Sequence, residues 1–484
     1  MKKKDLESDI STRLNRISTL IGHEKKTMKF SSKEVVHFPL FFSEQVAPNI
    51  SMEYMDSCAT AIGLISYKML HDTNDEDKTV VNNAIRAVLK MQNPDKSWSS
   101  VMYQGNDNQK KQLDGIIIEI CFALNALIEC SFLDKTYLYD ETVLAEFQIE
   151  DIQDRINFVV DSVKWLNDNK EDQGWYYTTT RHFTETNSIL PAASSTIGVI
   201  DILNRITLKF KALQKENVQI KQQDINLIET LMQNAIKTLF DMQKSSGGFS
   251  KKRGDPESIA QTSNAIIVLL QLDENFIKPE YEHGIKRAID WLLPRMKNIY
   301  DDEIVDVTDY IDEYDQIIVE DQRPLKRPIR HETQLDIHSF IAILKVSLSE
   351  RYLKLLSFRK KVSLHYHLKK MYHHIMGLQT DQGQYCGAFK CRRIIQSEKY
   401  PIYSTYLAII AFKSMQNEFE KFYMAYSTIN KYYTQLAMIV IGIIIVAFVL
   451  IFGDINSALV VFALSVAGNV VANPIIRKFN FKLF

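Results

Sequence analysis

Basic side chains gather in four separate loops of this chain, and three of these loops follow a Trp or Gly-x-Phe turn. The cations are Arg181, His182, Lys251, Lys252, Arg253, Arg323, Arg327, Arg330, Lys390, Arg392 and Arg393. Cations that share one surface attract phosphates and other polyanions, even in a protein whose formal net charge is only -1. The pattern therefore predicts a binding site for an anionic nucleotide or a short oligonucleotide.

Hydroxyl groups stand directly after two of these loops, where helices are expected to begin. The candidate ligand-binding hydroxyls belong to Thr262 and Ser404. The N–H groups and positive dipole end of a helix N-terminus favour phosphates at such positions. Nearby aromatic rings such as Trp98 could stack on bases. For Trp175 and Phe249 we expect packing in the core beneath their turns.

These loops belong to a repeated pattern. A helix ends in Gln or Trp-Leu, a polar turn and an aromatic residue follow, and a second helix begins with small residues. Clear copies contain Gln92 and Trp98, Leu166 and Trp175, Gln243 and Phe249, and Gln379 and Phe389, while weaker copies cover about residues 8–70 and 284–348. Helix pairs that cannot bury their apolar faces alone stack on one another. The sequence therefore predicts an all-α fold, an (α/α)6 toroid of six helix-hairpin repeats.

The repeat resembles the terpenoid cyclase and protein prenyltransferase superfamily of (α/α)6 toroids over about residues 8–416. The turns after Gln243 and Gln379 look like the QW-type repeats of that superfamily. The resemblance implies chemistry on polyenes or lipid diphosphates. However, the chain has neither the D-x-D-D run that supplies a proton nor the DDxxD run that holds Mg²⁺.

The zinc motif of the prenyltransferases is also incomplete. Asp56 and Cys58 match its D-x-C pair, but Tyr403 stands near the position of the family's His, and His338 lies on another inner helix. We therefore expect no metal, no cofactor and no catalytic residue, and we favour a protein that is not an enzyme.

Composition narrows the class of protein further. Proline and glycine are scarce, with 11 and 16 residues, which agrees with long helices. The five cysteines include no C-x-x-C pair, so a reduced cytosol fits better than a disulfide framework. The N-terminus has no apolar stretch typical of a signal peptide.

Four histidines are expected to face the surface of an outer helix: His365, His367, His373 and His374.

Two apolar runs lie near the end of the chain, at residues 436–452 and 455–476. Each is close to the ~20 residues that cross a hydrocarbon core, and only a short turn separates them. They predict an antiparallel transmembrane hairpin followed by a basic tail. Basic residues flank the hairpin but are absent from its turn, so both of its ends should face the cytoplasm of a bacterial inner (cell) membrane.

The hairpin carries polar and small residues that suit self-association. Asn469 and Asn473 share one helix face, where they would meet partner helices or line a pore. Gly468 beside them permits close approach of helices. In a homo-oligomer, Asp454 would form an acidic ring at the outer mouth of the pore.

Together these features predict three parts: a cytoplasmic ligand-sensing toroid (1–420), a juxtamembrane linker (421–434) and the transmembrane hairpin (435–484). The expected function is a ligand-controlled membrane effector in antiphage defence, whose pore depolarises the membrane when the toroid binds a nucleotide signal. This order of parts looks like that of Hailong-type bacterial effectors, which implies a nucleotidyltransferase partner. Two alternatives stay open: a membrane-anchored isoprenoid cyclase or prenyltransferase-like enzyme acting on a lipid diphosphate, and a scaffold that binds a partner protein.

Overall fold

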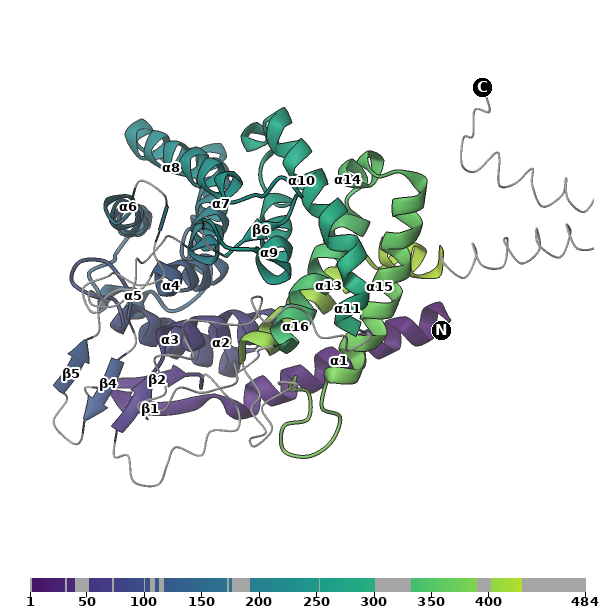
Figure 1. Cartoon of the computed structure of the whole chain (residues 1–484). Coiled ribbons are helices and arrows are strands. Elements are labelled where there is room, and N and C mark those ends of the chain that lie inside the picture. Colours follow the sequence, from purple (N-terminus) through teal and green to yellow (C-terminus); the bar gives the residue numbers. More distant parts are fainter. Residues whose placement is uncertain are drawn as a thin grey trace, which may run out of the picture. The chain divides into compact units, whose positions relative to one another are not determined.

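Two compact units make up the chain, Met1–Phe422 and Tyr423–Phe484. The computed structural model describes residues 2–30, 33–39, 52–71, 74–99, 101–104, 109–112, 117–171, 174–175, 192–251, 253–300, 332–389 and 402–428 (Figure 1). The following account concerns the described part of the first unit.

Six inner helices of this unit form a closed ring. They are α2 (Ser57–Leu70), α4 (Ile117–Glu129), α7 (Ala193–Lys215), α9 (Ile259–Leu269), α13 (Glu332–Leu348) and α16 (Ile402–Asn417). Each packs against the next in this order, and α16 packs against α2. The inner helices are apolar on most sides, as expected for helices covered all round. In α2, for example, ten of the eleven side chains from Ser57 to Tyr67 are buried, and Cys58 is half-buried.

Six outer helices surround this ring. They are α1 (Lys3–Glu24), α3 (Asp75–Lys90), α6 (Ile152–Asp168), α8 (Gln222–Asp241), α10 (Pro279–Leu292) and α15 (Phe358–Leu378). Outer helices pack on inner ones, as α8 does on α7 and α15 does on α13 (Figure 1). Their apolar residues form one stripe; in α8 the buried Ile228, Leu231, Met232, Ala235 and Leu239 recur at helical spacing. The predicted all-α toroid is therefore confirmed.

The glutamine turns join consecutive outer helices. Gln243, just after α8, donates from Nε2 to the carbonyl oxygens of Gly247 and Gly284, at 2.8 Å each. Gly284 belongs to the next outer helix, α10. Gly247 has φ +111, and a Cβ there would collide with the main chain of Arg287. Only glycine combines this conformation with such a close approach.

Aromatic side chains lie beneath these turns. Trp98 and Trp175 are fully buried, and their indole N–H groups donate to the carbonyl oxygens of Val88 at 2.9 Å and Leu166 at 2.7 Å. Phe249 and Phe389 are fully buried as well. The expectation of core packing for Trp175 and Phe249 is confirmed. Stacking of Trp98 on a base is excluded by its burial.

Short strands are the part of the fold that the sequence did not predict. Strand β1 (Lys26–Phe30) pairs with β2 (Lys33–His37), β3 (Met52–Met55) with β4 (Val101–Gln104), β4 with β5 (Gln109–Gln112), and β6 (Phe249–Ser250) with β7 (Glu257–Ser258), all antiparallel. Segments of two to five residues carry too little periodicity to be recognised. The described part of the unit also contains short helices: α5 (Glu141–Ala145), η2 (Glu274–Phe276), η3 (Leu293–Arg295), α11 (Met296–Tyr300) and α14 (Glu350–Leu355).

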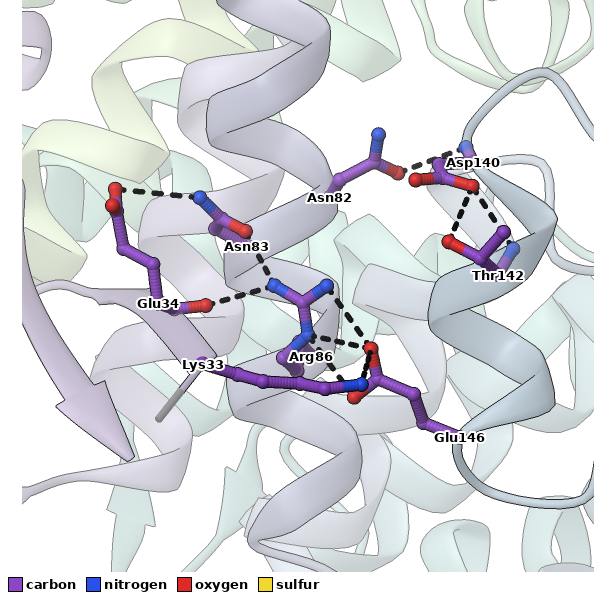
Figure 2. Close-up of polar contacts among 8 residues, drawn as sticks. All are labelled: Lys33, Glu34, Asn82, Asn83, Arg86, Asp140, Thr142 and Glu146. Atoms are coloured by element: carbon purple, nitrogen blue, oxygen red, sulfur yellow. Dashed lines mark hydrogen bonds and ion pairs between the residues drawn. The ribbon is translucent and has the colours of Figure 1, made fainter. Parts of the chain in front are cut away.

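Charged side chains hold the β1–β2 hairpin against α3 and α5 (Figure 2). Lys33 at the start of β2 and Arg86 on α3 both contact the carboxylate of Glu146, at 2.7 Å and 3.2 Å. Arg86 also donates to the carbonyl oxygen of Glu34, at 2.8 Å. The shared carboxylate and the bond from Arg86 to Glu34 thus hold the hairpin against the outer helix α3.

The predicted transmembrane hairpin, with Asp454, Gly468, Asn469 and Asn473, lies outside the described residues. Within the described ranges, no helix is both long enough and apolar enough to cross a membrane.

Candidate active site inside the ring

Side chains from inner helices that are not neighbours meet inside the ring. The rings of Phe122 on α4 and Tyr403 on α16 lie edge to face, with centroids 5.8 Å apart. Helices α4 and α16 flank α2 on its two sides. Their side chains can therefore touch only on the interior side of α2. Both rings are half-buried, so this interior is partly accessible to solvent.

An imidazole joins this aromatic pair. His338 on α13 places Nε2 3.2 Å from the hydroxyl oxygen of Tyr403, and only 5% of His338 is exposed. Imidazole is the side chain best suited to take up and release protons near neutral pH. His338 therefore qualifies as a general acid or base.

Two carboxylates are buried at the N-terminal ends of neighbouring inner helices. Asp56 begins α2 and accepts from the main-chain N–H of Ala59 at 2.6 Å, which satisfies the helix end. Ser57 donates to Oε2 of Glu119 on α4 at 2.5 Å. Only 3% of Asp56 and 2% of Glu119 is exposed. Asp and Glu side chains are rarely buried this fully unless they are paired or have a functional role.

The thiol of Cys58 lies close to both carboxylates. Burial, followed by the charges of Asp56, Glu119 and the Cys121 thiol, raises the pKa of Cys58 well above its usual value. The thiol therefore stays protonated near neutral pH. In the described part of the chain, no group of three or more His, Cys, Asp or Glu side chains could hold a metal ion.

A second set of charges lies deeper along the inner helices, and we call it the charged layer. It comprises Asp201 and Arg205 on α7, Glu129 on α4 and Lys345 on α13. Arg205 lies 3.1 Å from Asp201 and 2.5 Å from Glu129. Burial opposes the charge of Arg205, but Asp201, Tyr406 and Glu129 together raise its pKa, so it stays protonated.

The charged layer reaches across the ring. Asp201 on α7 acts electrostatically on Cys121 of α4, Lys345 of α13 and Tyr406 of α16. Burial lowers the pKa of Lys345, which Asp201 opposes and Arg205 reinforces.

The structure describes only part of the predicted anion site. Lys251 is half-buried and its carbonyl oxygen accepts from the N–H of Ala193, the first residue of α7, at 2.8 Å. Arg253 is exposed. Outside the described residues lie Arg181, His182, Lys252, Arg323, Arg327, Arg330, Lys390, Arg392 and Arg393. Whether these cations share a surface stays a prediction.

The two predicted hydroxyls have different surroundings. Thr262 is buried, and its Oγ1 accepts from the main-chain N–H of Phe249 at 2.8 Å. It therefore supports the turn before α9. Ser404 is fully buried, and its Oγ has no hydrogen-bond partner in the described structure, as is also true of Ser195 and Thr405.

The histidines of α15 do not all face the surface, which corrects the prediction. His367 is buried and its Nδ1 lies 3.1 Å from the hydroxyl of Tyr300. His374 pairs with Asp336 of α13, with Nε2 and Oδ2 2.9 Å apart. His365 is half-buried, and only His373 is exposed. The outer helix thus turns most of its imidazoles toward the protein.

Several interior residues escaped the sequence analysis, namely Glu119, Asp201, Arg205 and Lys345. One signal was available. Glu119 interrupts the apolar run of α4, where an isolated charge on a helix covered all round marks a functional or paired position. No comparable signal distinguishes Asp201 and Arg205, because ion pairs four residues apart also occur on exposed helices.

No protein-family model and no curated protein matches the chain. Solved structures do resemble it. The cellobiose 2-epimerase from Spirochaeta thermophila has a TM-score of 0.60 at 12% identity, covering 86% of this chain and 97% of that one. The cellobiose 2-epimerase from Bacillus thermoamylovorans has a TM-score of 0.57 at 8% identity, covering 85% and 99%. A D-mannose isomerase has a TM-score of 0.52 at 10% identity, covering 84% and 97%.

These likenesses show a toroid fold and correct the predicted function. The similar structures are named as sugar-converting enzymes, which contradicts the predicted nucleotide-controlled pore in antiphage defence. The same finding overturns the isoprenoid alternative. The resemblance to terpenoid cyclases and prenyltransferases holds only at the level of the toroid, and nothing supports the likeness to Hailong-type effectors.

Proposed function

We propose that this protein is a carbohydrate-converting enzyme that transfers a proton at the carbon beside a sugar carbonyl, with its active site inside the ring. The observation that carries the proposal is the contact between His338 and Tyr403. It places an acid–base group against a hydroxyl, in a partly accessible interior bordered by aromatic rings.

The proposed reaction is aldose–ketose isomerisation or epimerisation at C2. His338 removes the C2 proton of the open-chain sugar, and the electron pair moves toward the carbonyl oxygen to give an enediolate. The Tyr403 hydroxyl stabilises that oxygen by donating a hydrogen bond. Return of the proton to C1, with the O2 proton passing to O1, gives the isomeric ketose. Rotation about the C2–C3 bond presents the opposite face of C2 to His338, and return of the proton there gives the epimer. Atoms and electrons balance within the sugar, so the reaction consumes no second substrate.

Aromatic side chains inside the ring suit a polyhydroxylated ligand. Half-buried Phe122 and Tyr403 offer apolar faces on which a sugar ring can pack.

The likeness to known structures supports the same chemistry. Three similar proteins with a TM-score above 0.5 are named as two cellobiose 2-epimerases and one D-mannose isomerase. Both names describe a rearrangement within one sugar. At identities of 8–12% these likenesses show the fold alone, so the proposal rests on the residues inside the ring.

A product assay with His338→Gln tests the proposal. The purified full chain is incubated with aldohexoses and reducing disaccharides, and new epimers or ketoses are separated by chromatography. We expect turnover by the parent protein and a loss of at least about 100-fold in His338→Gln. His373→Gln, which changes an exposed imidazole of an outer helix, should retain full activity.

Equal melting temperatures of the two variants will exclude unfolding as the cause. If His338→Gln does not fold, Tyr403→Phe serves as the second variant, with an expected loss of about tenfold or more from one missing hydrogen bond. Full activity of a folded His338→Gln protein would refute the proposed role, and absence of turnover with every sugar would refute the function.

A further inference from the structure

The phenol ring of Tyr403 is in contact with side chains from three helices. Its hydroxyl oxygen lies 3.2 Å from Nε2 of His338 on α13, and the two ring centroids are 5.6 Å apart. Phe122 on α4 meets the phenol ring edge to face, with 5.8 Å between centroids and an angle of 80° between the ring planes. Tyr406, three residues later on α16, has its ring centroid 6.2 Å away. Tyr403 is thus held both through its hydroxyl and through its ring.

The hydrogen bond between Tyr403 and His338 has to be given up during the proposed reaction. Nε2 is the nitrogen of His338 that faces Tyr403, so it is the one that reaches the C2 proton of a sugar whose carbonyl oxygen lies at the Tyr403 hydroxyl. As the base, Nε2 turns its electron pair toward that proton. The hydroxyl has a single hydrogen, which it then donates to the carbonyl oxygen. In this state the position of Tyr403 depends on its ring contacts.

Among these ring contacts, the one with Phe122 ties Tyr403 to a different part of the interior. Tyr406 lies on the same helix as Tyr403 and moves with it. Phe122 lies on α4, which is separated from α16 by α2 in the order of the ring. Edge-to-face pairs have a preferred geometry and an attraction beyond the burial of their surface. Phe122 can therefore keep the phenol ring in place without using its hydroxyl.

We infer that Phe122 is a positioning residue, which holds the Tyr403 hydroxyl at the carbonyl oxygen of the sugar once the bond to His338 has been given up. The inference rests on the proposed function. Phe122 then acts on kcat, because the hydroxyl binds the enediolate oxygen more strongly than the neutral carbonyl oxygen of the substrate. Packing of Phe122 against the sugar alone would change KM instead.

A double-mutant cycle with the purified full chain tests this role, with deuterium exchange at C2 of D-mannose as the measured reaction. Phe122→Leu should lower kcat about three- to tenfold, the size of one edge-to-face contact, and change KM by less than about twofold. In the Tyr403→Phe background, which keeps the ring and lacks the hydroxyl, the same substitution should change kcat by less than about twofold. A residue that only supports the fold would lower kcat by the same factor in both backgrounds.

Phe158→Leu on the outer helix α6 is a matched control. Phe158 is half-buried like Phe122, and its ring meets that of Trp98 at the same centroid distance of 5.8 Å and an angle of 73°. This variant should keep the kcat of the parent protein. Phe122→Tyr, which retains an aromatic ring, should keep kcat within about twofold. If Phe122→Leu does not fold, Phe122→Met takes its place, because methionine adapts to irregular gaps in a core.

The outcomes separate the inference from the proposed function. Equal losses of kcat in the two backgrounds would overturn the inference and leave the proposed function standing. So would an effect on KM alone, or unchanged kinetics in a folded Phe122→Leu protein. Absence of exchange with the parent protein would overturn the proposed function and the inference together. Melting curves of each variant show that the protein compared is folded.

Discussion

Arg13, near the start of the chain, donates to Oε1 of Gln379 at 3.1 Å, although 366 residues separate them. The contact joins the first outer helix to the turn after the last one. Arg287 makes the same contact with Gln243, at 2.9 Å, between α10 and the turn after α8. The same Arg–Gln contact thus links neighbouring outer helices at two places, one of them between the first and the last outer helix.

Arg13→Ala should therefore destabilise the toroid. Arg13 also donates to the carbonyl oxygen of Met376 at 3.0 Å, so the substitution removes more than one bond to the last repeat. We expect the free energy of unfolding to fall by about 1–3 kcal/mol in urea denaturation. Arg359→Ala, at an exposed position of α15, should change it by less than about 0.5 kcal/mol. Equal effects of the two substitutions would contradict this role of Arg13.

Two glycines near the end of α15 should respond in opposite directions to alanine. Gly387 has φ +102, and a Cβ there would lie 2.6 Å from the carbonyl oxygen of Arg16, so Gly387→Ala should cost about 2 kcal/mol or more. Gly377 lies within the helix with no atom within 4 Å of its Cβ position. Gly377→Ala should therefore stabilise the fold by up to about 1 kcal/mol. Melting temperatures of both variants provide the check.

Acid should destabilise the protein through its buried histidines. Burial lowers the pKa of His367 to about 4, and burial together with Lys361 lowers that of His365 to about 4. Below about pH 6.5 these imidazoles are protonated in the unfolded chain but not in the folded protein. The free energy of unfolding therefore decreases as the pH falls from about 6.5 to 4. The expected loss at pH 5.5 is about 1 kcal/mol for His367.

Urea denaturation at pH 7.5 and pH 5.5 measures this loss. In His367→Gln, which cannot be protonated in this range, the difference between the two pH values should shrink by about 1 kcal/mol. His373→Gln should shrink it less, because this exposed imidazole is only partly shielded from solvent. An unchanged pH dependence in His367→Gln would show that the imidazole titrates equally in both states.

Membrane attachment through residues 435–484 stays a prediction from the sequence. Two apolar runs of sufficient length predict that the full chain sediments with membranes and resists extraction by alkaline carbonate. A chain that stops after residue 434 should remain in the supernatant. Recovery of the full chain in the supernatant would refute the predicted hairpin. The result would leave the proposed sugar chemistry unaffected, because that rests on residues of the toroid.

The sequence revealed the outer helices because they carry a 3.6-residue apolar period over ten or more residues. The glutamine turns were recognisable because Gln243 and Gln379 each precede a Gly-x-Phe sequence. The candidate site was far harder to predict. His338, Tyr403 and Phe122 come from three helices separated by 65 or more residues, and only ring closure brings them together.

The hydrophobic periodicity of the sequence did not show which side chains face the interior of the ring. The basic loops suggested an anionic ligand, because their charge can be recognised from the sequence without knowledge of the fold. The interior pairs of Asp201 with Arg205 and of Ser57 with Glu119 depend on which helix face turns inward. An inner helix is apolar on most sides, so its hydrophobic pattern does not mark the inward face.

Deuterium exchange in D₂O tests the central claim most directly. An aldohexose is incubated with the full chain, and proton NMR follows loss of the C2 hydrogen signal, which reports proton transfer even when no net product accumulates. The account predicts enzyme-dependent exchange that falls at least about 100-fold in His338→Gln and persists in His373→Gln. Exchange at the parent rate in a folded His338→Gln protein, or no exchange with the parent protein, would contradict it.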